Sequence, residues 1–394
     1  MTPRAGLPDV VIHEATADEL REWDRWTVEP VGGTVLQSRA WAAYRESLGW
    51  RSRHLVFDDG FRTLSLERPW PIVGGAGAYL SRGPIGGDGP VERTADRLRA
   101  AADWLAAHGV DVVASDAEIE AATGYGRLIE ERGFAPIDEV QPSRHRMRLA
   151  LPAGTDGAAV FGGFSATLRQ LIRGAEKSGL RVVRYDARWA PGIGDWSGAD
   201  VPSPDPGRSA DDRAAAALGA DATRAMFGRL YELLAAAAER RHFHIGSRDG
   251  FISWSMAALA AGQLVYLEAR DSDGAMLGGA TFYRHGRRLT YSHSGDRVEV
   301  RRTHPGVVRL ILWRAIQVAL SEGLDEMDLA GVDVPGARRV PEPTEPMYGL
   351  YAFKRSFGAE WLELAGNHEW VARPMRYLAG RAAGRILGLG GGGR

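Results

Sequence analysis

Hydrophobic and polar positions in the first part of the chain predict a mixture of strands and helices. Period-two runs predict a hairpin of strands Arg53–Phe57 and Arg62–Arg68 around the turn Asp58–Gly60. A helical period covers Val91–His108, and a buried strand is predicted at Val110–Ala114. The other elements that we predict here are a strand at Val10–Ile12, a helix from Thr16 or Asp18 to Trp26, a helix capped by Ser38, a strand at Ala78–Leu80, a short helix at Leu128–Arg132 and a strand at Arg144–Leu151.

A similar order of elements returns in the second part of the chain. Strands at Leu264–Arg270 and Gly279–Tyr283 form a predicted hairpin, and a long helix at Pro305–Ser321 precedes a strand at Leu324–Leu329. The helix-to-strand junctions also compare closely, as AAHGVDVVASD and LSEGLDEMDLAG. We interpret the pattern as a tandem duplication of one α/β unit. Chance similarity is the alternative, and the shared order of elements disfavours it.

The segments between and after the repeats set the expected domain boundaries. A helix at Ala166–Ser178, a strand at Leu180–Tyr185 and an apolar helix at Thr223–Arg240 are predicted. Residues 189–211 are rich in Gly, Pro, Asp and Ser, which is typical of a surface loop or a flexible insertion. We expect one domain over residues 1–152 and a second over residues 153–359. The C-terminal segment 360–394 is expected to pack back on the first domain.

Composition narrows the class of protein. A chain of 394 residues exceeds one ordinary core, and its hydrophobic fraction of 44% and charged fraction of 25% are typical of a globular protein. The net charge of −1 gives no global basic field, so a nucleic acid would have to bind a local patch. The absence of cysteine excludes disulfides and thiolate metal sites. The N-terminus lacks a signal-peptide core and no apolar run is long enough to span a bilayer, so we expect a cytoplasmic protein.

Common phosphate and metal motifs are missing from the sequence. The glycine-rich run Gly74–Gly77 does not lead into a helix, so it is a poor dinucleotide fingerprint. His242 and His244 alternate on one predicted strand, but no third ligand has suitable spacing, and we expect no metal site.

Lysine usage draws attention to one residue. Of the 49 Lys and Arg residues only Lys177 and Lys354 are lysine. Arginine carries a wide planar fork and lysine a compact ammonium, so a lysine in such a sequence is a candidate for a task that arginine cannot perform. Lys177 lies on a predicted exposed helix face, where chance explains it. Lys354 lies in a short helical pattern among aromatic residues, and we interpret it as functional.

Further cations and aromatics lie near the ends of the predicted strands. Such groups suit an anionic substrate, because arginine forks match phosphate and carboxylate oxygens. Each one alone is more often a surface residue or a local ion pair, and the set matters only if the fold brings it to one cleft. Its members are Arg45, Arg82, Arg240, Arg241, Tyr291, His293, Arg301, Arg302 and Lys354.

The sequence also resembles a known family. The stretches SATLRQLIRGAEKSGLRV, HPGVVRLILWRAIQVALSEGLDEMDLAGV and YGLYAFKRSFGAE resemble the Fem family of aminoacyl-tRNA-dependent transferases, which build peptidoglycan interpeptide bridges. The first half adds LQSRAWAAYRESLGW and AYLSRGPIGG, and the most specific match is the FK-x-x-FG motif at Phe353–Gly358. The resemblance implies two acetyltransferase-like (GNAT) domains in tandem, an α/β fold, without the helical arm of some members.

The resemblance also implies an activity. An amine on a muramyl-pentapeptide precursor, UDP-linked (UDP-MurNAc-pentapeptide) or lipid-linked (lipid II), would attack the ester of an aminoacyl-tRNA, without a cofactor. Lys354 would stabilise the developing oxyanion and Phe353 would shape the wall beside it. Asp328 is a weak candidate for a general base, and a structural role at a strand end fits it better. The implied contacts to the precursor are Arg45, Arg240 or Arg241, and Tyr291, with His293 where a second aromatic is common and Arg302 among the nearby cations.

Three alternatives and one uncertain segment accompany this interpretation. An acyl-CoA-dependent N-acyltransferase is the first alternative, although Pro305 removes a backbone N–H where a pyrophosphate loop needs donors. A tRNA-dependent peptide natural-product ligase and a non-catalytic binder of cell-wall precursors are the others. Residues 371–394 contain five arginines and no acid, and suit either a membrane surface or packing on the first domain with the cations in water. We favour packing, through the stripe of Met375, Leu378, Ala379, Ala382 and Ile386, and expect a monomer.

Overall fold

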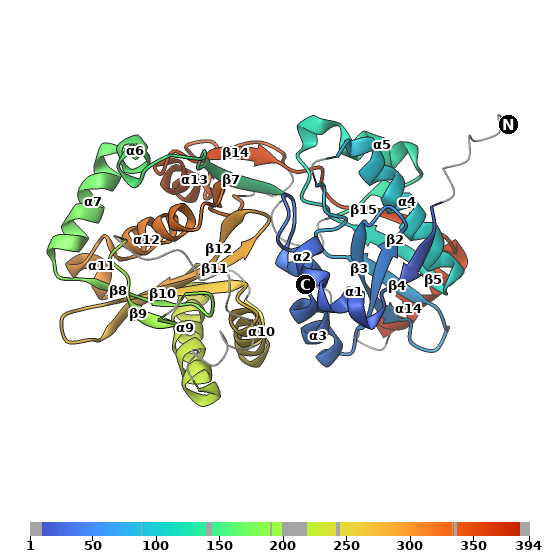
Figure 1. Cartoon of the computed structure of the whole chain (residues 1–394), viewed down its shortest axis with the longest axis horizontal. Helices are drawn as coiled ribbons and strands as arrows, with labels where there is room; N and C mark the ends of the chain where they lie inside the picture. The colour runs from blue at the N-terminus through green and yellow to red at the C-terminus, as the bar shows by residue number, and fades with distance from the viewer. Residues whose placement is uncertain are drawn as a thin grey trace. The chain divides into compact units, whose positions relative to one another are not determined.

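The computed structural model describes residues 10–87, 89–138, 144–189, 191–198, 219–241, 245–332, 334 and 337–386. The chain divides into two compact units (Figure 1). Unit 1 comprises Met1–His145 together with Leu362–Arg394, and unit 2 comprises Arg146–Trp361. None of the helices in the described parts of the chain is both long and apolar enough to cross a lipid bilayer.

Unit 1 is built on a seven-stranded sheet of order β1-β2-β3-β4-β5-β15-β6. Strands β4 and β5 run parallel, and β15 from the end of the chain lies antiparallel between β5 and β6. The strands are β1 (Ile12–Glu14), β2 (Arg51–Phe57), β3 (Arg62–Pro69), β4 (Ala76–Leu80), β5 (Val110–Ser115), β6 (Ala135–Pro136) and β15 (His368–Val371). The helices are α1 (Ala17–Arg21), α2 (Trp23–Thr27), α3 (Arg39–Ser47), α4 (Val91–Ala107), α5 (Tyr125–Glu131) and α14 (Pro374–Ile386), with single 3-10 turns at Val35–Gln37 and Ala121–Thr123.

The core of unit 1 lies between its sheet and the helices α4 and α5. Buried positions of α4, among them Ala95, Leu98 and Leu105, recur at helical spacing. They pack on strand residues such as Leu80 and Val113. This regular spacing is the reason why the sequence predicted α4 to within one residue at its end.

Unit 2 is built on an eight-stranded sheet of order β14-β7-β13-β12-β11-β10-β8-β9. Its parallel pair is β12 and β13. The strands are β7 (His145–Ala150), β8 (Arg181–Tyr185), β9 (Ile193–Asp195), β10 (Leu264–Arg270), β11 (Met276–His285), β12 (Arg288–Asp296), β13 (Glu326–Asp328) and β14 (Glu360–Glu363). The helices are α6 (Gly157–Gly163), α7 (Ala166–Lys177), α9 (Ala220–Arg241), α10 (Arg248–Ala260), α11 (Val300–Thr303), α12 (Val307–Ser321) and α13 (Tyr348–Arg355).

Helices cover both faces of the unit 2 sheet. On one face the core joins α7, α12 and α13 to strand residues such as Leu267 and Phe282. On the other face α9 and α10 lie on the sheet, with Phe227 of α9 next to the ring of Tyr266 at 5.7 Å between centroids (Figure 1). Alternate strand residues therefore point into two separate layers, as strand geometry requires. The predicted α/β architecture with two similar units is confirmed.

Several expectations need correction. The predicted flexible insertion at residues 189–211 begins as ordered structure, because Trp189 and Trp196 are buried around β9 and stack on Arg184 at 5.2 and 4.9 Å. Residues 199–211 of that insertion lie outside the described residues, as do His242 and His244. The helices α6 and α10 were not predicted. The apolar stripe of α14 does not pack on unit 1 as expected, since Met375 and Leu378 are exposed.

Candidate active site

The two parallel strands of unit 2, β12 and β13, pair over only three residues. Residues 288–290 of β12 pair with residues 326–328 of β13, where β13 ends, while β12 continues to Asp296. Ligands of open α/β sheets bind at the carboxyl ends of parallel strands, where backbone groups are not used by a neighbouring strand. The carboxyl end of β13 is therefore the place in unit 2 to look for chemistry.

Lys354 lies at this strand end. It is on α13, and its side chain is 3% exposed. Its Nζ donates to the carbonyl oxygens of Ala330 at 3.0 Å and Gly331 at 2.8 Å, directly after β13. Ala330 has a φ of 60° and donates its N–H to Oδ1 of Asp328 at 2.8 Å. Two side chains thus fix the turn that follows β13, and Asp328 has the structural role that the sequence favoured.

Phe353 and Phe357 form an apolar wall next to Lys354. Phe357 is fully buried in the core, and the half-buried ring of Phe353 meets it edge-on at 5.6 Å. The guanidinium of Arg309, on the first turn of α12, lies 5.4 Å from the centre of the Phe353 ring, and burial lowers the pKa of Arg309. Arg309 is not predicted as functional from the sequence, because its position in HPGVVRL has no distinguishing local signal.

Tyr291 and His293 do not share one surface. A bulge at Ser292 shifts the β11–β12 register, so that Tyr291 pairs with Phe282 and His293 pairs with Thr281. The Tyr291 ring consequently lies 5.8 Å from Phe282 in the core on the α12 face. His293 lies on the opposite face, 5.3 Å from Phe251 of α10, and burial lowers its pKa to about 4. The structure therefore does not bring the two side chains together on one surface, and their contact with a substrate stays a prediction.

The remaining predicted cations of unit 2 are spread over its helices. Arg240 is exposed on the last turn of α9, and Arg302 is exposed on α11. The side chain of Arg241 lies outside the described residues. Both of these side chains lie in solvent, whereas Lys354 is buried at the end of β13.

Arg45 in unit 1 has unusual surroundings. Its guanidinium lies 4.4 Å from the ring centre of Trp50 and 5.3 Å from that of Trp41, and its buried Nε has no hydrogen-bond partner within the described residues. Burial lowers the pKa of Arg45. Arg68 approaches the same Trp50 ring at 5.7 Å. A buried donor without an acceptor indicates a position where a bound anion would be stabilised.

The parallel pair of unit 1 ends differently from that of unit 2. Asp116, after β5, is 1% exposed and accepts from Tyr79 at 2.7 Å and from the backbone N–H of Arg82 at 2.6 Å. The Nε of Arg82 lies 3.4 Å from Asp116. Burial raises the pKa of Asp116, and the charge of Arg82 opposes that rise. A carboxylate with these partners closes the strand end of unit 1.

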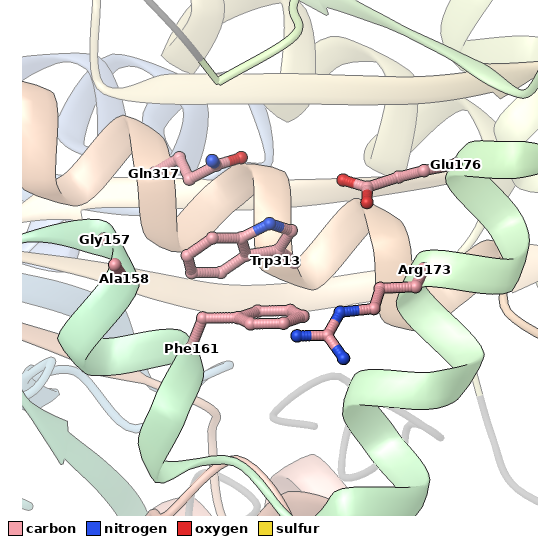
Figure 2. A pocket seen from close by; sticks show the side chains of 7 residues that line it. All are labelled: Gly157, Ala158, Phe161, Arg173, Glu176, Trp313 and Gln317. Atoms are coloured by element: carbon pink, nitrogen blue, oxygen red, sulfur yellow. The ribbon is translucent and has the colours of Figure 1, made fainter.

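A shallow cavity of about 340 Å³ lies elsewhere in unit 2, between α6, α7 and α12 (Figure 2). The ring of Phe161 lies below that of Trp313, and the guanidinium of Arg173 is 5.4 Å from the Phe161 ring centre. Glu176 and Gln317 at its rim both bind Arg314. None of the residues that the sequence predicted as functional lines this cavity, which is formed by Gly157, Ala158, Phe161, Arg173, Glu176, Trp313 and Gln317.

Neither unit presents a metal centre in its described part. No group of three or more His, Asp or Glu side chains there is placed to hold a metal ion. The two histidines considered from the sequence, His242 and His244, lie outside the described residues.

The fold of this chain is similar to that of known proteins. The family model described as acetyltransferase (GNAT) domain matches residues 207–355, a range that includes β12, β13 and Lys354. The crystal structure of FemX has a TM-score of 0.71 with 17% identity, and the alignment covers 94% of this chain and 100% of FemX. The chain has a tandem GNAT fold. A conserved protein of unknown function from Bacteroides thetaiotaomicron VPI-5482 aligns with 91% of this chain and 98% of its own length, with a TM-score of 0.52 and 9% identity.

Because the two units share the GNAT fold, the ends of their parallel strands can be compared directly. The ends of β5 and β13 lie at matching places in the two GNAT units, because each is the second strand of its parallel pair; Asp116 follows β5 directly, whereas the Lys354 side chain reaches the end of β13 from α13. No curated protein sequence matches the chain. The match to the acetyltransferase (GNAT) domain model supports a transferase that moves an acyl group.

Proposed function

We propose that this tandem GNAT protein is a Fem-type aminoacyltransferase. It transfers an amino acid from an aminoacyl-tRNA to an amine of a muramyl-pentapeptide precursor that is UDP-linked or lipid-linked. The amine nitrogen attacks the ester carbonyl, an amide bond forms, and the ester bond to the tRNA oxygen breaks. The proton of the amine passes to solvent or to the departing tRNA oxygen. The observation that carries the proposal is the ammonium of Lys354, held at the carboxyl end of β13.

Lys354 acts through its positive charge. The attack on an ester produces a tetrahedral intermediate with a negative oxygen, and a fixed cation near that oxygen lowers the barrier. The carbonyls of Ala330 and Gly331 hold the ammonium at 3.0 and 2.8 Å, so it needs no reorganisation when the charge develops. Removal of one such electrostatic group typically lowers the rate by about 10²–10³-fold. The planar fork of arginine is wider and would not keep both carbonyl contacts.

Arg45 is our candidate for the anionic part of the acceptor. A phosphate or carboxylate oxygen would satisfy its buried Nε and would lie against the indole of Trp50. Arg68 on the same ring adds positive charge to this position. We assign acceptor recognition to unit 1 and the chemical step to unit 2.

Acyl-CoA is a poorer donor for this chain. GNAT enzymes that use CoA hold its pyrophosphate at the start of the long helix, which is α12 here. Gly306, the N-cap of α12, lies so close to α7 that a Cβ atom on it would be 2.5 Å from the carbonyl oxygen of Leu171 and 2.8 Å from Ala175. Pro305 before it has no N–H to donate. The start of α12 is therefore packed closely against α7 and has one backbone donor fewer to offer a pyrophosphate.

A defined reaction mixture tests the proposal. The protein is incubated with UDP-muramyl-pentapeptide and a pool of charged tRNAs, or with acetyl-CoA in place of the tRNAs, and the products are weighed by mass spectrometry. We expect a gain of one amino-acid residue with charged tRNAs alone. The gain should disappear in Lys354→Met and persist in Lys177→Met, which removes the only other lysine. A mass gain of one acetyl group, or full transfer by Lys354→Met, would overturn the proposal.

A further inference from the structure

The C-terminal helix α14 presents its apolar side to solvent. Met375 is 82% exposed and Leu378 is 60% exposed, and Ala379 and Ala382 on the same side are exposed as well. Isolated surface hydrophobics are ordinary, but an apolar stripe along one helix is not. The orientation is opposite to the one expected from sequence, in which the stripe faced the domain and the cations faced water.

Specific contacts fix this orientation. The guanidinium of Arg376 donates to Oδ1 of the buried Asp111 through Nε at 2.8 Å and through Nη2 at 2.6 Å. Gly380 lies against Trp70, where a Cβ atom would approach the indole to 2.5 Å. Trp70 in turn donates its Nε1–H to Oδ2 of Asp111 at 2.9 Å. The polar side of α14 is thus bound to unit 1, and the helix cannot rotate to bury Met375 without breaking these contacts.

A third exposed apolar side chain lies in a turn that packs against α14 through Trp70. Ile72 is 87% exposed in the turn between β3 and β4, which Trp70 and Asp111 tie to the helix. Its φ of 71° lies in the left-handed region, and the N–H of Val73 donates to the carbonyl of Pro71 at 2.8 Å across it. A β-branched residue in such a three-residue turn is strained. This strained turn presents a large apolar side chain to solvent, which indicates a contact outside unit 1.

Charge indicates the occupant of this surface. Residues 371–386 contain four arginines and no acidic residue; Arg373 and Arg376 share the single carboxylate of Asp111, and Arg381 is exposed on α14. Exposed aliphatic tips flanked by cations are the pattern of segments that lie in the headgroup region of an anionic bilayer. We propose that Ile72, Met375, Leu378 and Arg381, the α14 patch, dock unit 1 on an anionic lipid surface. This inference does not depend on the proposed function.

A protein partner fits the α14 patch less well. A stable interface buries about 800 Å² on each partner, whereas three aliphatic side chains on a turn and one helix make a much smaller patch. A bilayer needs no matching shape, because lipids rearrange around inserted side chains. Each inserted aliphatic side chain is expected to strengthen partitioning about tenfold.

Vesicle co-sedimentation tests the α14 patch. The full chain is mixed with vesicles of phosphatidylcholine alone or with phosphatidylglycerol added, at low and at high salt. We expect binding to the phosphatidylglycerol vesicles that weakens with salt, and about a hundredfold loss in the double variant Ile72→Ser, Leu378→Ser. Val11→Ser is the matched control, because Val11 is 63% exposed in unit 1 outside the patch, and it should bind as the wild type does.

Two results would overturn the inference. One is a wild-type protein that stays in the supernatant with both vesicle types, and the other is equal sedimentation of the double variant and Val11→Ser. Analytical ultracentrifugation without lipid tests whether a second copy of the chain binds the α14 patch instead. Self-association that the double variant abolishes, in a protein that does not bind vesicles, would assign the patch to a second copy. The transfer reaction with a UDP-linked acceptor requires no vesicle. Its result therefore does not depend on whether the protein binds lipid.

Discussion

The two units have the same short helix after the second strand of their parallel pair, but its central side chain differs. In unit 1, Ile129 lies four residues before Gly133, which has a φ of 89°. In unit 2, Lys354 lies four residues before Gly358, which has a φ of 82°. Ile129 is 1% exposed in an apolar core, whereas Lys354 is 3% exposed with its ammonium on two backbone carbonyls.

The difference between Ile129 and Lys354 distinguishes a residue that the fold requires from one that serves another role. Unit 1 shows that this helix position can be filled by a hydrocarbon, so a buried ammonium is not required to close the turn. The strand end in unit 1 is instead closed by Asp116 with Arg82 and Tyr79. A buried cation is costly unless polar groups surround it. Its presence in one unit alone supports a role for Lys354 in chemistry, and assigns structural closure to Asp116.

The largest effect on stability is expected from placing a lysine at the unit 1 position that corresponds to Lys354. Ile129→Lys would remove a fully buried side chain and place a charge where no carbonyl cradle exists. We expect the free energy of unfolding to fall by about 4 kcal/mol or more. Urea denaturation followed by tryptophan fluorescence measures it. A loss below about 1 kcal/mol would show that the two helix positions are not distinguished by their surroundings.

The next largest effect concerns one half-buried histidine in each unit. Burial lowers the pKa of His54 in unit 1 and of His293 in unit 2 to about 4. The unfolded chain binds a proton at each histidine below about pH 6.5 and the folded chain does not, so stability falls as the pH drops from 6.5 to 4. Each residue contributes up to about 3 kcal/mol to this loss. Unfolding curves at pH 7 and pH 5 should show it, and His293→Asn should reduce the pH dependence, whereas an unchanged dependence would contradict the burial of His293.

The smallest effect is expected at Arg45. Arg45→Met would keep the packing on Trp50 and remove the charge, and we expect KM for the precursor to rise about 10–100-fold with kcat little changed. Steady-state kinetics with UDP-muramyl-pentapeptide measure both constants. Arg25→Met is the matched control, because Arg25 also lies on a tryptophan, 5.9 Å from the ring centre of Trp26, but is exposed and paired with Glu22. An equal rise in KM in Arg45→Met and Arg25→Met would contradict the proposal that Arg45 binds the acceptor.

Much of the fold follows from local patterns in the sequence. The spacing of apolar residues in α4 and α12, and the glycines that end them, gave both helices and the repeat of the units. The same local signals placed Lys354 on a short helix, and a sparse residue type marked it for attention. A lysine at that position is visible in the sequence, but the two carbonyls of Ala330 and Gly331 that hold it are not.

What failed depends on contacts between distant segments. The bulge at Ser292 puts Tyr291 and His293 on opposite faces, and no local signal announces a bulge. The orientation of α14 depends on Asp111, more than 260 residues away, which binds the arginines that were expected in water. Trp189 and Trp196 stack on Arg184 and so order a segment whose composition is typical of a loop.

The single-turnover rate of amide formation by Lys354→Met tests the central claim most directly. With saturating charged tRNA and precursor, we expect a rate about 10²–10³-fold below that of the wild type and of Lys177→Met, with the same result for Lys354→Arg. The melting temperatures would show whether the variants remain folded, since two carbonyls lose a donor at a cost of about 1–3 kcal/mol. A folded Lys354→Met protein that forms the amide at the wild-type rate would contradict the account.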